Sequence, residues 1–136
     1  MTFETRFPTR HTDTYASSGF VHAGVLLALT ELAYAAFEAH CGIGKPETTL
    51  AVPRETRVSY HRPLPWREGV RMVVETTAVG AHGFSQEFTC FSDASGVRIA
   101  TFQHDWVWLD LQTGRPVALT EVVQEQYRSG GAEEES

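Results

Sequence analysis

One carboxylate stands inside the most apolar segment of the chain. Residues 17–37 read SSGFVHAGVLLALTELAYAAF, and Glu31 is the only acid among them. Apolar surroundings disfavour the charged form of a carboxylate, and a carboxylate tuned in this way can act as a general base or nucleophile. Glu31 could equally lie at a subunit interface, pair with an arginine or face solvent. Periodicity alone leaves these interpretations open.

A second candidate group lies where the helix that carries Glu31 begins. Gly19, Ala23 and Gly24 surround His22 at this point. The first N–H groups of a helix lack intrahelical partners and carry the positive end of its dipole, so they can hold an oxyanion. Eight residues of helix separate Ala23 from Glu31 by about 12 Å. We therefore expect that the two come from different subunits or that loop geometry shortens the gap. His22 is either a helix cap or a site residue.

The elements that position these groups can be read from the sequence pattern. Gly42 and Gly44 end the only long helix, and alternating or β-branched stretches between turn residues indicate strands. The predicted order is a strand over 3–10, a loop over 11–19, a helix over 21–41, strands over 48–61, 70–79, 84–91 and 97–111, and a short helix over 118–130.

This order predicts an α+β fold in which one long helix is wrapped by an antiparallel sheet, with the last four strands forming a meander. Such a sheet keeps two exposed edges and one incompletely covered face. Pairing with a second copy of the chain is the usual way in which such edges and faces become covered. We expect one domain over residues 1–128 and a disordered acidic tail over residues 129–136.

Composition narrows the class of protein. The formal charge of −6 argues against a nucleic-acid partner. Glu31 or His22 interrupts every apolar run that approaches the roughly 18 residues of a membrane span, so no membrane partner is expected. Neither a secretion signal nor a metal-type spacing of Cys41 and Cys90 is visible. We expect a cytoplasmic protein with reduced thiols.

Several kinds of site are disfavoured. The sequence contains no G-x-S-x-G, H-E-x-x-H or C-x-x-C motif and no phosphate-binding loop. His104 and Asp105 are adjacent on a predicted strand, so they point to opposite faces and cannot act as one dyad. We expect no metal site.

Two motifs resemble those of the hotdog-fold thioesterases. GFVHAGVLLALTELA (19–33) is similar to the signature G-x-x-H-G-G with an acid nine residues after the His. VSYHRPLPWREG (58–69) is similar to a family strand that ends in an aromatic-x-R-P turn. The resemblance spans roughly residues 3–117 and favours the 4-hydroxybenzoyl-CoA thioesterase and related groups. It implies a hotdog fold with a long central helix, a five-stranded antiparallel sheet and a short C-terminal helix.

The resemblance also implies an activity. It predicts hydrolysis of an acyl or aryl thioester of coenzyme A at the interface of a homodimer or a dimer of dimers. Glu31 would be the nucleophile or general base, and the Ala23 amide, beside His22 and Gly24, would polarise the thioester carbonyl. Ala23 replaces the first Gly of the motif, which is tolerable because only its N–H is needed. No cofactor is implied beyond the coenzyme A carried by the substrate.

The sequence departs from the family pattern at several positions. Ala16 stands where Asn or Gln is frequent, although Ser17 and Ser18 follow it, and Ala35 replaces a hydroxyl found in some members. Another branch of the superfamily has its catalytic Asp in the loop before the helix, where this chain has Asp13. Its spacing to Gly19 is one residue longer than expected for that branch, and an Asx turn is the alternative.

Basic residues gather around one predicted strand and the turn after it: Arg54, Arg57, His61, Arg62 and Arg67. They are either solvated side chains or contacts for the phosphates of coenzyme A. For substrate binding we single out Arg57, His61 and Arg62, with Ser17 and Ser18.

Two other functions remain open. One is a hotdog-fold enoyl-thioester hydratase or dehydratase that uses His22. The other is a non-catalytic acyl-CoA binding module in which Glu31 is structural.

Overall fold

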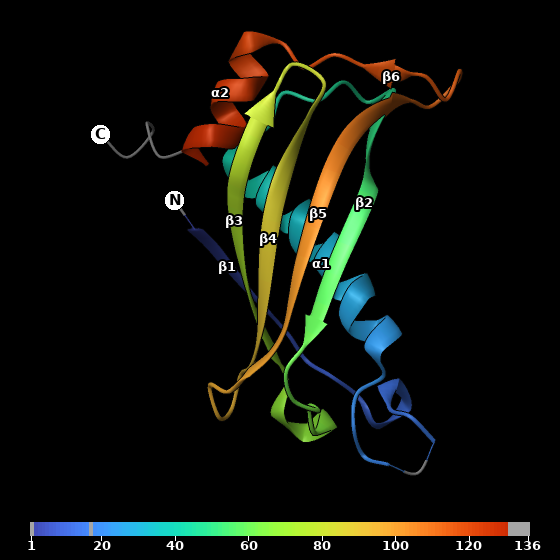
Figure 1. The fold of residues 1–136 in the computed structure, drawn as a ribbon, viewed down its shortest axis with the longest axis vertical. Coiled ribbons are helices and arrows are strands. Elements are labelled where there is room, and N and C mark those ends of the chain that lie inside the picture. The colour runs from blue at the N-terminus through green and yellow to red at the C-terminus, as the bar shows by residue number, and fades with distance from the viewer. Residues whose placement is uncertain (1, 17, 131–136) are drawn as a thin grey trace.

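The computed structural model describes residues 2–16 and 18–130, and its elements follow the predicted order (Figure 1). Within these residues the chain forms β1 (Thr2–Phe7), the 3-10 turn η1 (His11–Asp13), α1 (Ala23–Cys41), β2 (Thr49–Tyr60), the 3-10 turn η2 (Trp66–Glu68), β3 (Val70–Gly80), β4 (Gly83–Ser92), β5 (Arg98–Asp110), β6 (Pro116–Val117) and α2 (Glu121–Ser129). Only η1, η2 and the two-residue β6 were not predicted.

The strands form one antiparallel sheet in the order β1-β3-β4-β5-β2, with β6 added beside β5. The predicted four-strand meander is therefore wrong in one respect. β3, β4 and β5 do follow one another, but β2 lies against β5 and not against β3. The segment between β2 and β3 consequently has to cross from one side of the sheet to the other. β1 and β2 are its two edges (Figure 1).

Helix α1 crosses behind the sheet and supplies one side of the core (Figure 1). Its buried residues recur at helical spacing and pack on the inner face of the sheet: Leu26, Leu29, Thr30, Ala33, Tyr34, Phe37 and Cys41. Gly42 ends it in a left-handed conformation with φ of 63°. The sheet wraps only this side, because Leu27 and Leu32 on the outer side are 37% and 56% exposed. The outer side of α1 is therefore uncovered in the single chain.

Helix α2 ties the end of α1 to the sheet. Thr120 caps it by accepting a hydrogen bond from the Val123 N–H at 3.2 Å. The buried Tyr127 hydroxyl lies 2.7 Å from that of Tyr34 on α1 and accepts from Trp108 Nε1 on β5 at 3.1 Å. Both hydroxyls are therefore satisfied inside the core. Residues 131–136 of the predicted tail lie outside the described residues. Within the described ranges, neither helix is long and apolar enough to cross a membrane.

Candidate active site

The helix start carries two side chains that engage the first backbone amides. His22 is the N-cap, and its Nδ1 accepts from the Gly24 N–H at 2.8 Å. A side chain at position 24 would have its Cβ only 3.0 Å from that nitrogen, so Gly24 gives the ring room to close. The Ala23 N–H donates to the Tyr15 hydroxyl oxygen at 3.1 Å. Tyr15 was not singled out from the sequence.

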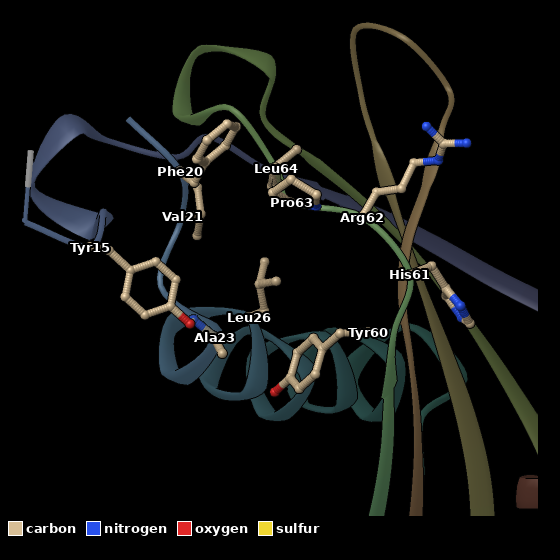
Figure 2. Close-up of a pocket in the computed structure, with 10 residues that line it drawn as sticks. All are labelled: Tyr15, Phe20, Val21, Ala23, Leu26, Tyr60, His61, Arg62, Pro63 and Leu64. Atoms are coloured by element: carbon tan, nitrogen blue, oxygen red, sulfur yellow. The ribbon is translucent and has the colours of Figure 1, made fainter. Parts of the chain in front are cut away.

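A hollow of about 440 Å³ opens in front of this helix start. Ala23 and Leu26 of α1, Tyr15 of the preceding loop and Tyr60 at the end of β2 line it (Figure 2). Its volume lies in the range of small-molecule sites, which are usually apolar with a few polar groups. His61 and Arg62 contribute to the rim, but their side chains point away from the space between the two tyrosines (Figure 2).

Glu31 lies at a different hollow on the outer side of α1, with a volume of about 280 Å³. This hollow is bounded by Leu50 near the start of β2 and also contains Glu38 and Lys45. Lys45 Nζ lies 3.6 Å from a Glu38 carboxylate oxygen, so that acid has a cationic partner. Glu31 is exposed and, among the described residues, makes no hydrogen bond or ion pair.

Asp13 occupies η1 and is held by Arg10. Its carboxylate accepts from the Arg10 backbone N–H at 2.8 Å and from Arg10 Nη2 at 3.2 Å. Partial burial acts to raise the pKa of Asp13, but the hydrogen bonds and charge of Arg10 outweigh it and hold that pKa below its ordinary value. The backbone oxygen of Asp13 accepts from the His22 N–H at 2.7 Å. Asp13 therefore helps to fix the loop that leads into the helix.

The structure does not bring all the predicted site residues together in one chain. Ala23 and Glu31 line separate hollows, as the helical rise of about 12 Å between them requires. Ser18 accepts from the Phe20 N–H at 3.1 Å and so closes a turn, while Ser17 lies outside the described residues. Arg57 donates to Gln103 Oε1 at 2.9 Å, across the β2–β5 pair.

A buried polar cluster lies on the inner side of α1, next to Glu31 in sequence. The Thr30 hydroxyl donates to the Leu27 carbonyl oxygen at 2.6 Å. It must then accept from His104 Nε2, 2.7 Å away, which leaves His104 Nδ1 to accept from the Thr56 hydroxyl at 2.8 Å. Burial lowers the pKa of His104 to about 4, although the charge of Asp105 acts in the opposite direction. His104 is thus neutral, with its proton on Nε2.

Potential metal ligands do not gather anywhere in the described part of the chain. No group of three or more His, Cys, Asp or Glu side chains that could hold an ion occurs there.

Comparison with known proteins identifies the family. A model of the thioesterase-like superfamily matches residues 10–127, so the chain belongs to this superfamily. This membership confirms the predicted enzyme class, thioester hydrolase. No protein with a curated description matches the sequence.

Solved structures confirm the hotdog fold. A putative oleoyl thioesterase from Lactobacillus plantarum is 17% identical with a TM-score of 0.82. The match covers 94% of this chain and 50% of that one. A Thermus thermophilus thioesterase complexed with coenzyme A and Zn is 24% identical with a TM-score of 0.78, covering 95% and 94% of the two chains. A 1,4-dihydroxy-2-naphthoyl-CoA thioesterase from Synechocystis is 15% identical with a TM-score of 0.76, covering 100% and 99%. This chain thus spans half of the first protein and nearly all of the other two.

Proposed function

We propose that the protein hydrolyses an acyl or aryl thioester of coenzyme A at the interface of a homodimer, with Glu31 as the catalytic carboxylate. The observation that carries the proposal is the state of three acids: Glu31 in the middle of α1, Glu38 in its C-terminal half and Asp13 in η1 before it. Glu38 has Lys45 as a partner and Asp13 has Arg10, whereas Glu31 makes no ion pair in the described residues. An unpaired carboxylate beside an open hollow is available to accept a proton.

Strand β2 supplies the geometric reason for two subunits. It is an edge strand, so its outward backbone groups can pair with another chain. The Glu31 hollow is lined by Leu50 and the helix-start hollow by Tyr60. These two residues lie near opposite ends of β2, about 33 Å apart along the strand. Two-fold antiparallel pairing of β2 with its copy sets the beginning of one strand against the end of the other. Glu31 of one subunit then faces the helix start of its partner.

The chemistry of this arrangement balances without any cofactor. Glu31 takes a proton from water, the water oxygen attacks the thioester carbon, and the negative charge develops on the carbonyl oxygen at the partner's helix start. The carbon–sulfur bond then breaks, and the coenzyme A sulfur leaves and takes up a proton, giving the free acid and the thiol. Direct attack by the Glu31 carboxylate, followed by hydrolysis of the anhydride, gives the same products.

Basic side chains near the end of β2 suit the phosphates of coenzyme A. Arg62 and His61 extend outward from the rim of the helix-start hollow (Figure 2). Arg57 lies on β2, four residues before His61, which directly follows the strand. In this proposal these residues bind the nucleotide part of the substrate while its thioester enters the hollow. The relatives named for coenzyme A thioesters, and the Thermus structure that contains coenzyme A, support this substrate class.

The decisive experiment measures thiol release from a panel of acyl- and aryl-CoA thioesters, together with the mass of the active species. We expect thiol release and, by size-exclusion chromatography with light scattering, at least twice the chain mass of 15.1 kDa. A stable, active monomer would refute the shared site. Hydration of an enoyl-CoA without thiol release would favour the hydratase alternative, and tight binding without turnover would favour a binding module.

A further inference from the structure

We propose that the hydroxyl group of Tyr15 contacts the thioester carbonyl oxygen and acts as a donor to the oxyanion, with the Ala23 N–H acting through it. This inference rests on the proposed thioesterase function and names a catalytic residue for it. At the start of α1, the Ala23 N–H is the group expected to meet the substrate. In the structure this N–H already donates to the Tyr15 hydroxyl oxygen at 3.1 Å.

The direction of that hydrogen bond leaves the phenol proton available. A tyrosine hydroxyl can accept one hydrogen bond and still donate its own proton. In the Ala23–Tyr15 bond the backbone N–H is the donor, so the phenol oxygen is the acceptor. Among the described residues, the Tyr15 hydroxyl makes no second hydrogen bond. An amide at the positive end of a helix dipole polarises the phenol and makes its O–H a stronger donor.

The local backbone places the phenol at the helix start. The Tyr15 N–H donates to the Phe20 carbonyl oxygen at 3.0 Å, and the Ser18 N–H donates to the Tyr15 carbonyl oxygen at 3.1 Å. The Tyr15 ring also lies against the His22 ring, with centroids 4.5 Å apart. These contacts hold the ring between the loop and the cap residue.

The surroundings of the phenol suit an oxyanion donor. Its hydroxyl lies beside Ala23, and Leu26 and Tyr60 face the same hollow (Figure 2). Tyr15 is 45% exposed in the free protein, and a substrate that fills the hollow excludes water from its hydroxyl. Hydrogen bonds to a developing charge are strengthened where water is excluded. A carbonyl oxygen that enters the hollow in front of α1 can meet the phenol proton without breaking the Ala23–Tyr15 bond.

A covering role for Tyr15 predicts the opposite behaviour. If the phenol only shields the Ala23 amide, a substrate must displace it before the amide can bind the carbonyl oxygen. Removing the hydroxyl would then free the amide and leave kcat unchanged or raise it. If the phenol is the donor, removing its hydroxyl lowers kcat.

The test is Tyr15→Phe, which keeps the ring and deletes the hydroxyl, assayed with the acyl-CoA that the wild type hydrolyses best. Loss of one oxyanion donor lowers kcat by on the order of 10²-fold, and we expect KM to change little. The melting temperature is measured alongside, so that activity is expressed per folded molecule. Tyr15 is 45% exposed, so folding should tolerate the change.

Tyr60→Phe is the matched comparison, because it removes the other hydroxyl of the same hollow, for which no hydrogen bond to the helix start is present in the described residues. Its kcat should fall far less than that of Tyr15→Phe. An unchanged or raised kcat in Tyr15→Phe, or equal losses in both variants, would overturn the inference. A wild type that releases no thiol from any acyl-CoA would refute the proposed function itself, and the inference with it.

Discussion

Two neighbouring residues of α1 show how differently this helix uses its polar side chains. Thr30 points into the core, is fully buried and has both a donor and an acceptor partner. Glu31, the next residue, faces the outer hollow and has no polar partner in the described part of the chain. A helical turn of 100° per residue is enough to separate the two environments.

Thr30 and Glu31 differ in what their surroundings allow: a buried polar group must be hydrogen-bonded, whereas an exposed one is free to react. A buried polar group costs free energy unless it is hydrogen-bonded, so the Thr30–His104–Thr56 cluster must be complete to be tolerated. An exposed carboxylate has no such requirement and can stay unpaired. Substitutions on the inner side of α1 should therefore lower mainly the stability of the fold. Substitutions at Glu31 on the outer side should lower mainly kcat.

The largest effect is expected from Glu31→Gln, which removes the base and keeps the shape. Loss of a general base should lower kcat by about 10²–10⁴-fold. The melting temperature should stay near that of the wild type, because within the residues that the structure describes Glu31 makes no ion pair or hydrogen bond that the amide would break. Steady-state thiol release and a thermal melt measure the two quantities on the same sample.

Two matched variants sharpen this test. Glu38→Gln changes an acid of the same hollow that is already paired with Lys45, and Asp13→Asn changes the loop acid paired with Arg10. Both should keep far more activity than Glu31→Gln. If Asp13→Asn abolishes turnover and Glu31→Gln does not, the catalytic acid is the one in the loop. If Glu31→Gln lowers the melting temperature but leaves kcat per folded molecule unchanged, the role of Glu31 is structural.

A smaller effect, on stability alone, is expected from the inner side as the pH falls. The folded-state pKa of His104 is about 4, below the ordinary 6.5, so the unfolded chain binds more protons between these values. The contribution of His104 to stability is therefore complete above about pH 6.5 and is lost as the pH falls toward 4. By pH 5 this amounts to about 2 kcal/mol of unfolding free energy. Urea unfolding at pH 7 and pH 5 measures it.

His104→Gln is the control for this prediction. Its amide nitrogen can still donate to Thr30, while Thr56, whose side chain is on the exposed edge strand, can turn to water. The variant should lose much of the dependence on pH between 6.5 and 5. If it follows the same pH dependence as the wild type, His104 is not the group responsible.

The elements could be predicted because their signals are local. The apolar run before Gly42 and the alternation over 97–111 each depend on residues that are adjacent in sequence. The position of β2 could not be predicted in this way, because pairing with β5 joins residues such as Tyr60 and Ala100 across two intervening strands. Pro53 in β2 is compatible with an edge strand, which was a usable signal.

The candidate site was predicted in part for the same reason. Glu31 could be recognised as the single acid of an apolar helix, whereas Tyr15 reaches Ala23 only through the fold of the loop. His104 stood in an alternating row with Phe102 and Trp106, so its burial could have been inferred. Its two hydroxyl partners come from α1 and β2, and no sequence pattern connects them.

The smallest effect is expected at His22, where capping and catalysis can be separated. His22→Asn keeps a side-chain acceptor of the type that helix N-caps favour, so the Gly24 N–H retains a partner. The lost ring contact with Tyr15 is worth about 0.5–1.5 kcal/mol, which limits the fall in kcat to about tenfold. His22→Ala removes the acceptor as well and should lower stability by a further amount of about 1 kcal/mol. An imidazole that transfers protons would instead cost about 10²–10⁴-fold in kcat in both variants, with no relation to their melting temperatures. That result would favour lyase-type chemistry at the helix start, because the proposed hydrolysis requires His22 only as a cap.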